Sequence, residues 1–148
     1  MINWKKAREA QTKRDEEAEQ ELSQEGEREL VLVVDDEETN RKMLQRMLST
    51  HYDVITAENG KDALDKLQTP NISVIIADQR MPEMTGIEFC EAAEHQQHPA
   101  PRIILTGFAE LTDVIDAINK ANIFRFLTKP VEKSHLIETV QTAARQNK

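Results

Sequence analysis

Five polar side chains stand at the ends of short apolar runs, where a sheet would present them to a ligand. In chain order they are Asp35, Asp36, Asp78, Thr106 and Lys129. Carboxylates that lie close together repel one another, and they persist in that arrangement with a cation. Oxygen ligands on a loop suit Mg²⁺ better than zinc. The residues therefore predict a magnesium site, if the fold brings the aspartates together.

Such a site would hold the groups that phosphoryl transfer needs. A cation and a lysine neutralise phosphoryl oxygens, while a hydroxyl faces them and a carboxylate attacks as the nucleophile. Asp78 is the candidate nucleophile, because it ends the apolar stretch "VIIAD" and because Pro82 and Gly86 shape the loop that follows. The product would be an aspartyl phosphate.

Each of these residues also has an ordinary structural explanation. Asp-Asp after a strand is a frequent turn, and Lys129-Pro130 could simply terminate a strand. A single threonine at a strand end is a weaker signal still. The hypothesis depends on the conjunction of four strand ends, each of which carries a suitable group.

The elements that must position these residues alternate from residue 29 onward. Apolar, β-branched stretches predict strands, and helical spacing of apolar residues predicts the helices between them. The expected strands are 29–36, 53–58, 72–78, 102–107 and 123–128, and the expected helices are 38–50, 59–69, 86–98, 110–121 and 132–146.

This alternation predicts an α/β fold with a flavodoxin-like, doubly wound, five-stranded parallel sheet of order 2-1-3-4-5 and helices on both faces. The first, third and fourth strands are continuously apolar, as strands buried on both faces are. In this order the first and third strands are neighbours, so three carboxylates would crowd one corner. Ligands bind at the carboxyl ends of such strands.

Each predicted helix has one apolar face, and Thr39 or Asn40 is expected to cap the first of them. The residues expected on these faces are Met43, Leu44, Met47 and Leu48; Ala63, Leu64 and Leu67; Ile87, Cys90 and Ala93; Leu111, Val114, Ile115 and Ile118; and Leu136, Val140, Ala143 and Ala144.

The chain divides near residue 28 into a charged segment and a globular domain, 29–148. Residues 1–28 hold six basic and eight acidic side chains and few large apolar ones. Good helix formers without proline favour a helical extension or linker, although a charged tail is an equal alternative.

Composition narrows the partners and the compartment. A net charge of −8 disfavours binding to nucleic acid or to anionic membranes. Cys90 is the one cysteine, so an internal disulfide is excluded, and the four histidines lack metal-ligand spacing. The sequence has neither a membrane-spanning run nor a signal peptide, so we expect a cytoplasmic protein.

Four motifs resemble the receiver domain of two-component response regulators: "VLVVDDEETN", "VIIADQRMPEMTG", "IILTG" and "FRFLTKP". The resemblance covers residues 29 to about 146. It implies that Asp78 is the phosphoacceptor and that Asp35, Asp36, Asp78 and the backbone carbonyl of Arg80 bind Mg²⁺. It further implies that Thr106 and Lys129 contact the phosphoryl group, that Phe126 is the switch aromatic and that Pro130 is the usual proline after the lysine.

The resemblance implies a signalling role rather than that of a conventional enzyme. A histidine kinase or phosphotransfer protein would donate the phosphoryl group to Asp78, and the domain would lose it by autodephosphorylation. Thr106 would be drawn inward and Phe126 would follow, which would reshape the face formed by 110–121, 123–128 and 132–146. That face would contact an effector protein or domain, or a second copy in a homodimer.

Arg80 and Phe108 lie two residues beyond Asp78 and Thr106 and are expected to flank the phosphoryl group. Bulky side chains there could obstruct an attacking water. We therefore predict a long-lived aspartyl phosphate, although both side chains could equally point away.

Several alternatives remain open at the level of sequence. The chain could be a stand-alone regulator, or a receiver from a larger regulator or hybrid kinase, for example one with an HD-type phosphohydrolase output. A phosphatase of the haloacid-dehalogenase type also uses an aspartate nucleophile after a strand. Such phosphatases have a D-x-D pattern at the first strand, whereas this chain has Asp35-Asp36-Glu37 there. A receiver fold that binds a partner without phosphorylation would leave repelling carboxylates unused.

Overall fold

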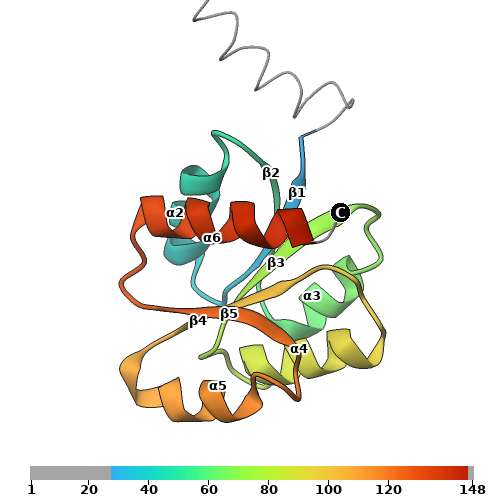
Figure 1. Cartoon of the computed structure of the whole chain (residues 1–148), viewed down its shortest axis with the longest axis vertical. Helices are drawn as coiled ribbons and strands as arrows, with labels where there is room; N and C mark the ends of the chain where they lie inside the picture. Colours follow the sequence, from blue (N-terminus) through green and yellow to red (C-terminus); the bar gives the residue numbers. More distant parts are fainter. Residues whose placement is uncertain (1–27, 147–148) are drawn as a thin grey trace, which may run out of the picture.

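A five-stranded parallel sheet forms the centre of the computed structural model, which describes residues 28–146. Its strands are β1 (Leu30–Val34), β2 (Asp53–Ala57), β3 (Ile72–Asp78), β4 (Arg102–Thr106) and β5 (Ile123–Thr128). They lie in the order β2-β1-β3-β4-β5, and all pair in parallel (Figure 1). This confirms the predicted fold and strand order. The predicted helical extension over residues 1–28 lies outside the described residues, apart from Arg28.

Helices cover both faces of the sheet, with α2 and α6 on one side and α3, α4 and α5 on the other (Figure 1). Their bounds are Glu38–Leu48 for α2, Gly60–Lys66 for α3, Gly86–His95 for α4, Leu111–Ala117 for α5 and Lys133–Gln146 for α6, and the 3₁₀ turn η1 (Phe108–Glu110) precedes α5. In the described part of the chain, none of these helices could cross a membrane.

The three central strands, β1, β3 and β4, are buried on both faces, because their side chains alternate between two hydrophobic cores on opposite sides of the sheet. Leu32 and Val34 of β1 pack in the cluster beneath α3 and α4, whereas Val31 and Val33 pack beneath α2 and α6. β3 and β4 divide in the same way. This explains why their sequences are continuously apolar rather than alternating.

The expected apolar helix faces are largely confirmed, with two errors: Met43 of α2 is 40% exposed, and Ile115 of α5 does not face inward as expected. Ile115 is 50% exposed, because α5 has only seven residues and turns Val114, rather than Ile115, fully into the core. The core also contains Phe89 of α4 and Thr139 of α6, which the sequence analysis did not include.

The expected cap of the first helix is also wrong. The helix begins at Glu38, and its N-cap residue Glu37 makes no side-chain capping bond. The carboxylate of Asp35 instead accepts a hydrogen bond from the Glu37 amide at 2.9 Å, so the turn after β1 fixes the start of α2. Thr39 and Asn40 therefore lie inside the first turn.

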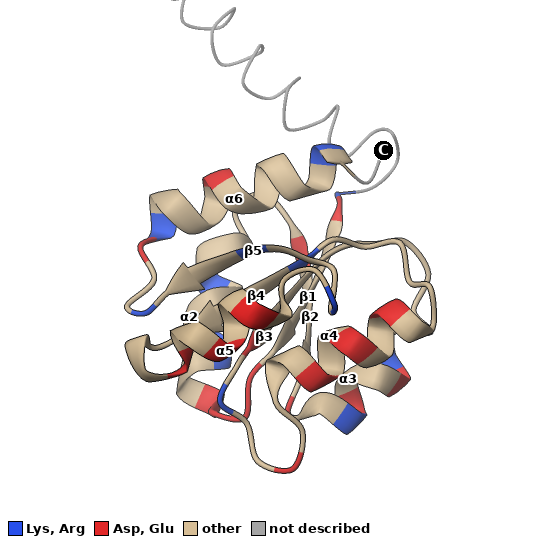
Figure 2. Cartoon of the chain, turned by 60° about the horizontal axis from the view of Figure 1, so that its bottom comes forward, with Lys and Arg blue, Asp and Glu red and all other residues tan. Residues whose placement is uncertain are grey.

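Charged residues lie mainly on the outer faces of the helices and on loops, and α4 carries Glu88, Glu91 and Glu94 (Figure 2). Arg102 is one of the buried exceptions, and it lies at the start of β4. Its guanidinium pairs with Glu94 and donates to the carbonyl oxygens of His98 at 2.9 Å and Ala100 at 3.1 Å. These bonds attach the end of α4 to the sheet.

Candidate functional site

Three carboxylates meet at the carboxyl ends of β1 and β3. One oxygen each of Asp35, Asp36 and Asp78 lies within 4.8 Å of the others. The two strands are direct neighbours, and Val34 pairs with Ala77, so the residues that follow are brought side by side. The structure therefore brings together the three aspartates that the sequence analysis predicted would crowd one corner.

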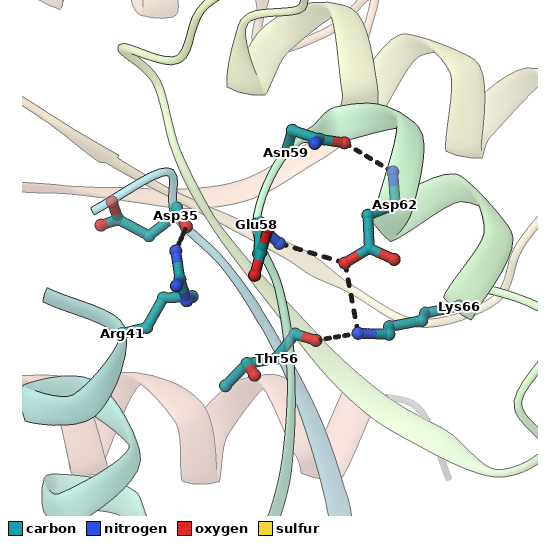
Figure 3. Close-up of polar contacts among 7 residues, drawn as sticks. All are labelled: Asp35, Arg41, Thr56, Glu58, Asn59, Asp62 and Lys66. Carbon is teal, nitrogen blue, oxygen red and sulfur yellow. Dashed lines mark hydrogen bonds and ion pairs between the residues drawn. The ribbon is translucent and has the colours of Figure 1, made fainter. Parts of the chain in front are cut away.

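Asp35 is held from three sides. Its side chain is 1% exposed, its Oδ1 accepts from the Glu37 amide, and its amide donates to Ala57 O of β2 at 3.1 Å. Its carbonyl oxygen accepts from Arg41 Nη1 at 2.7 Å (Figure 3). Oδ2 is buried without a hydrogen-bond partner among the described residues, so it is available to a ligand.

The electrostatics of Asp35 also fit a cation site. Burial raises the pKa of this carboxyl to about 6, and the nearby Asp78 charge adds to the rise. The hydrogen bond from Glu37 only partly offsets burial. A carboxylate that is costly to ionise in isolation becomes favourable beside a divalent cation, so the residues present fit Mg²⁺.

Asp78 faces Lys129, which follows β5. The Lys129 ammonium forms an ion pair with Asp78 Oδ1, and the Lys129 amide donates to Thr106 O at 2.9 Å. Burial raises the pKa of Asp78 even though the lysine acts in the opposite direction. The carboxylate is therefore held at the end of its strand beside one cation and two acids.

The loop after β3 is held tightly against Asp78. A methyl group at Gly86 would lie 2.6 Å from Asp78 O, so only glycine permits this approach. The Gly86 amide donates to Gln79 O at 3.1 Å, and Gln79 Oε1 accepts from the Ile87 amide at 2.9 Å. Thr85 and Glu88 close the start of α4 with a capping box.

Gln79 is a positioning residue that the sequence analysis missed. Its side chain is buried and bonds to an amide eight residues further on, so the role appears only once the loop is closed. In the sequence, the only signal for this role was that a glutamine, with its side-chain amide, directly follows the candidate nucleophile Asp78. Arg41, which holds the Asp35 carbonyl, was missed for the same reason.

A second polar network closes the neighbouring turn between β2 and α3. Asn59 Oδ1 accepts from the Asp62 amide at 2.7 Å, and Asp62 Oδ2 accepts from the Glu58 amide at 3.1 Å (Figure 3). Lys66 pairs with Asp62 and also donates to Thr56 O. This network fixes the end of β2, the strand that supports Asp35.

The remaining predicted residues lie around this corner in different environments. Thr106 is buried at the end of β4, and its hydroxyl donates to Gly107 O at 3.1 Å. Phe126 pairs with Ile104 across the sheet and packs half-buried against the core. The side chains of Arg80 and Phe108 are 86% and 85% exposed.

The sequence matches the response regulator receiver domain over residues 31–141. That match covers most of the chain. The chain belongs to the response regulator receiver domain family. Receiver domains are phosphoacceptors that bind Mg²⁺ through acidic residues and act with histidine kinases and effector domains.

Individual relatives agree with this placement. The hydrogenase transcriptional regulatory protein HoxA of Cupriavidus necator is 37% identical over 113 residues, which is 76% of this chain but only 23% of HoxA. A receiver domain protein from Clostridium thermocellum has a similar structure, with a TM-score of 0.75, 27% identity and coverage of 80% of this chain and 95% of that one.

A second solved structure is the receiver domain of an HD domain-containing protein from Pseudomonas fluorescens. It has a TM-score of 0.76 and 29% identity, with coverage of 81% of this chain and 97% of that one. Because the receiver spans less than a quarter of HoxA, these similarities identify the domain and leave the activity of any longer protein to be proposed.

Proposed function

We propose that this receiver accepts a phosphoryl group on Asp78 and uses it to change the surface formed by α5, β5 and α6. The observation that carries the proposal is the ion pair of Asp78 with Lys129 beside two further carboxylates. A structural salt bridge alone would not require Asp35 and Asp36. The charge of Asp36 raises the pKa of Asp78, and the charge of Asp78 raises the pKa of Asp35, so the three carboxylates repel one another.

The reaction transfers a phosphoryl group from a histidine of a kinase or phosphotransfer protein. An Asp78 oxygen attacks phosphorus, the phosphorus–nitrogen bond breaks, and the imidazole leaves with the bonding electrons and takes up a proton. Lys129 stays close enough to neutralise an oxygen of the transferred group. In autodephosphorylation, water attacks phosphorus, the bond to Asp78 breaks and inorganic phosphate leaves.

Asp35, Asp36 and Asp78 would hold the Mg²⁺ ion, with the Arg80 carbonyl as a further ligand. When bound, the ion supplies positive charge that the phosphoryl oxygens need in the transition state. The buried Oδ2 of Asp35 supports this assignment, because it lacks any other partner among the described residues.

Phosphorylation would change the partner of the Thr106 hydroxyl. In the unphosphorylated structure this hydroxyl donates to Gly107 O, and a phosphoryl oxygen on Asp78 is a stronger, charged acceptor. Movement of Thr106 toward it would free space beside Phe126, which is only half-buried at present. Phe126 would then turn inward and alter α5, β5 and α6.

The output of this signal depends on what the receiver contacts. A cytoplasmic protein partner, a second copy of the chain or a covalently attached effector domain could each recognise the altered face. The similarity to the receiver of an HD domain-containing protein supports an HD-type output as one such case. Direct binding of nucleic acid is disfavoured by the net charge of −8 of the chain.

The proposal is tested by labelling with acetyl phosphate in the presence of Mg²⁺. Mass spectrometry of the intact chain is expected to detect one added phosphoryl group, which Asp78→Ala abolishes and which the exposed control Asp113→Asn retains. Turnover of p-nitrophenyl phosphate is expected to stay at background, unlike that of a haloacid-dehalogenase-type phosphatase. Labelling that survives in Asp78→Ala would refute the assignment.

A further inference from the structure

An ion pair joins the loop after β3 to the turn after β4, and the proposed mechanism does not use it. Arg80 Nε lies 3.8 Å from Glu110 Oε1. The Arg80 side chain is 86% exposed, whereas the Glu110 side chain is only 23% exposed. The carboxylate is thus the fixed member of the pair, and the arginine is the member that can move.

Glu110 is fixed by the same turn that holds Thr106. Its amide donates to Gly107 O at 3.3 Å, and that carbonyl also accepts from the Thr106 hydroxyl at 3.1 Å. A methyl group at Gly107 would lie 3.1 Å from Glu110 Oε2, so the carboxylate lies close over the glycine. One carbonyl therefore connects the proposed phosphoryl-binding hydroxyl to the residue that pairs with Arg80.

We propose that Glu110 is a positioning residue for phosphorylation, which holds Arg80 outward in the unphosphorylated receiver and yields it to the phosphoryl group on Asp78. The inference rests on the proposed function of Asp78 and adds a partner exchange to it. Arg80 lies two residues from Asp78, and its own side chain is exposed between the buried Gln79 and Met81, so we expect this long side chain to reach either anion.

The exchange has a clear electrostatic direction. An ion pair at 3.8 Å with an exposed arginine is weak, because water and salt screen it. A phosphoryl group carries more negative charge than a carboxylate and presents several oxygens to the planar guanidinium. Arg80 therefore prefers the phosphoryl group once it is present, and Glu110 delays this contact beforehand.

The exchange would also carry the signal toward α5. When Arg80 leaves Glu110, the turn Phe108–Glu110 loses its ion pair to the loop after β3, and the Thr106 hydroxyl at the same time leaves Gly107 O, the N-cap carbonyl of that turn. That turn leads directly into α5. The charge on Asp78 would thus act on α5 through Glu110 as well as through Phe126.

The test is a double-mutant cycle on Arg80 and Glu110, read as the rate of labelling by acetyl phosphate with Mg²⁺ and the rate of subsequent decay. Glu110→Gln is expected to speed labelling about two- to fivefold, the scale of an exposed ion pair, and to slow decay because Arg80 is free to cover the phosphoryl group. In the Arg80→Ala background, Glu110→Gln is expected to change neither rate.

Two further variants separate this role of Glu110 from a general effect of charge or of loosened structure. Asp113→Asn removes another acidic charge nearby in sequence and is expected to leave both rates unchanged. Gly107→Ala keeps the Glu110 charge but crowds its carboxylate, and it is expected to shift both rates in the direction of Glu110→Gln. Loosened structure alone would instead hasten decay, and thermal melts identify any variant that is unfolded.

The outcomes distinguish this inference from the function on which it rests. If wild type is not labelled on Asp78, the proposed function and the inference both fail. If wild type is labelled and Glu110→Gln has no effect, or has the same effect with and without Arg80, the positioning role of Glu110 is overturned while the phosphoacceptor role of Asp78 stands.

Discussion

At the scale of single residues, Asp35 carries the clearest sign that this corner accommodates a cation. It is buried, one of its oxygens has no hydrogen-bond partner among the described residues, and its pKa is raised to about 6. The folded-state pKa lies above the unfolded value of 3.8, so between pH 3.8 and about 6 the native state holds a proton that the unfolded state has lost. Metal-free stability from this group is therefore lost as pH rises through about 6.

Asp35→Asn removes this titration and gives the first prediction. Without Mg²⁺, the variant is expected to be more stable than wild type by about 1–3 kcal/mol above pH 6.5, and the difference is expected to shrink toward pH 4. Addition of Mg²⁺ should stabilise wild type but not the variant. Urea unfolding between pH 4 and 8 measures both effects, and parallel pH profiles for the two proteins would contradict the account.

Arg80 and Phe108 give a second prediction at this scale. Each side chain is largely exposed and belongs to a residue two positions beyond Asp78 or Thr106, so we expect either to be able to cover a phosphoryl group once it is attached. Arg80→Ala and Phe108→Ala are each expected to speed decay of the aspartyl phosphate by about two- to tenfold, a change of up to about 1.4 kcal/mol in activation free energy. Decay is followed by mass spectrometry after removal of acetyl phosphate, with Ile115→Ala as an exposed apolar control, and unchanged rates would remove the shielding idea.

The sequence was sufficient to predict those site residues that can be recognised from their own type and from the strand directly before them. Asp78 ends an apolar strand, and Lys129 follows another, so their types and positions were sufficient to propose them. Gln79 and Glu110 act through bonds that depend on how two loops close, to an amide eight residues away and to an arginine on another loop. Such partners could not be predicted, because polar residues in loops are ordinary.

At the scale of elements, the loop between β3 and α4 depends on close backbone approach at Gly86. A Cβ atom there would overlap the carbonyl of Asp78, and neither backbone can move without displacing the strand end. Gly86→Ala is therefore expected to cost about 1–3 kcal/mol of unfolding free energy and to slow phosphorylation.

Gly107→Ala is the matched control for this third prediction. Its added methyl group would meet a side-chain oxygen of Glu110 at 3.1 Å rather than a backbone atom, so we expect a stability change within about 0.5 kcal/mol. Thermal or urea unfolding compares the two variants. Equal stability losses would show that contact with the Asp78 carbonyl is not what requires glycine at residue 86.

The connection from β4 to α5 gives a fourth prediction. Thr106→Ala removes the hydroxyl that would exchange Gly107 O for a phosphoryl oxygen. The variant is expected to bind beryllofluoride with Mg²⁺ more weakly than wild type, by a factor of up to about ten, since one hydrogen bond to a charged group is lost. It is also expected to show smaller amide chemical-shift changes across α5, β5 and α6. NMR titration measures both, and shifts equal to those of wild type would contradict the proposed switch.

Prediction of elements succeeded where burial determines the sequence and failed where packing geometry decides. β1, β3 and β4 are continuously apolar because both faces are covered, and that pattern alone placed them. Ile115 has the spacing of a core residue but is half exposed, since the short α5 contacts the sheet mainly through Val114. The start of α2 depends on Asp35, which spacing within the helix does not reveal.

At the scale of the whole molecule, the parallel order β2-β1-β3-β4-β5 assembles the site. It makes β1 and β3 neighbours and places β4 and β5 beside them, so four strand ends contribute to one edge. No single element holds more than two of the predicted residues. The match to the receiver family runs over residues 31–141 and so includes all four of these strand ends.

The most direct test of the account is a crystal structure of the receiver with Mg²⁺ and beryllofluoride. We predict that beryllium bonds to an Asp78 oxygen, that the metal ion lies among Asp35, Asp36 and Asp78, and that Lys129 and the Thr106 hydroxyl contact fluorine atoms. Beryllofluoride bound elsewhere, or a corner without metal and with Thr106 still on Gly107 O, would contradict the claim that this site accepts a phosphoryl group.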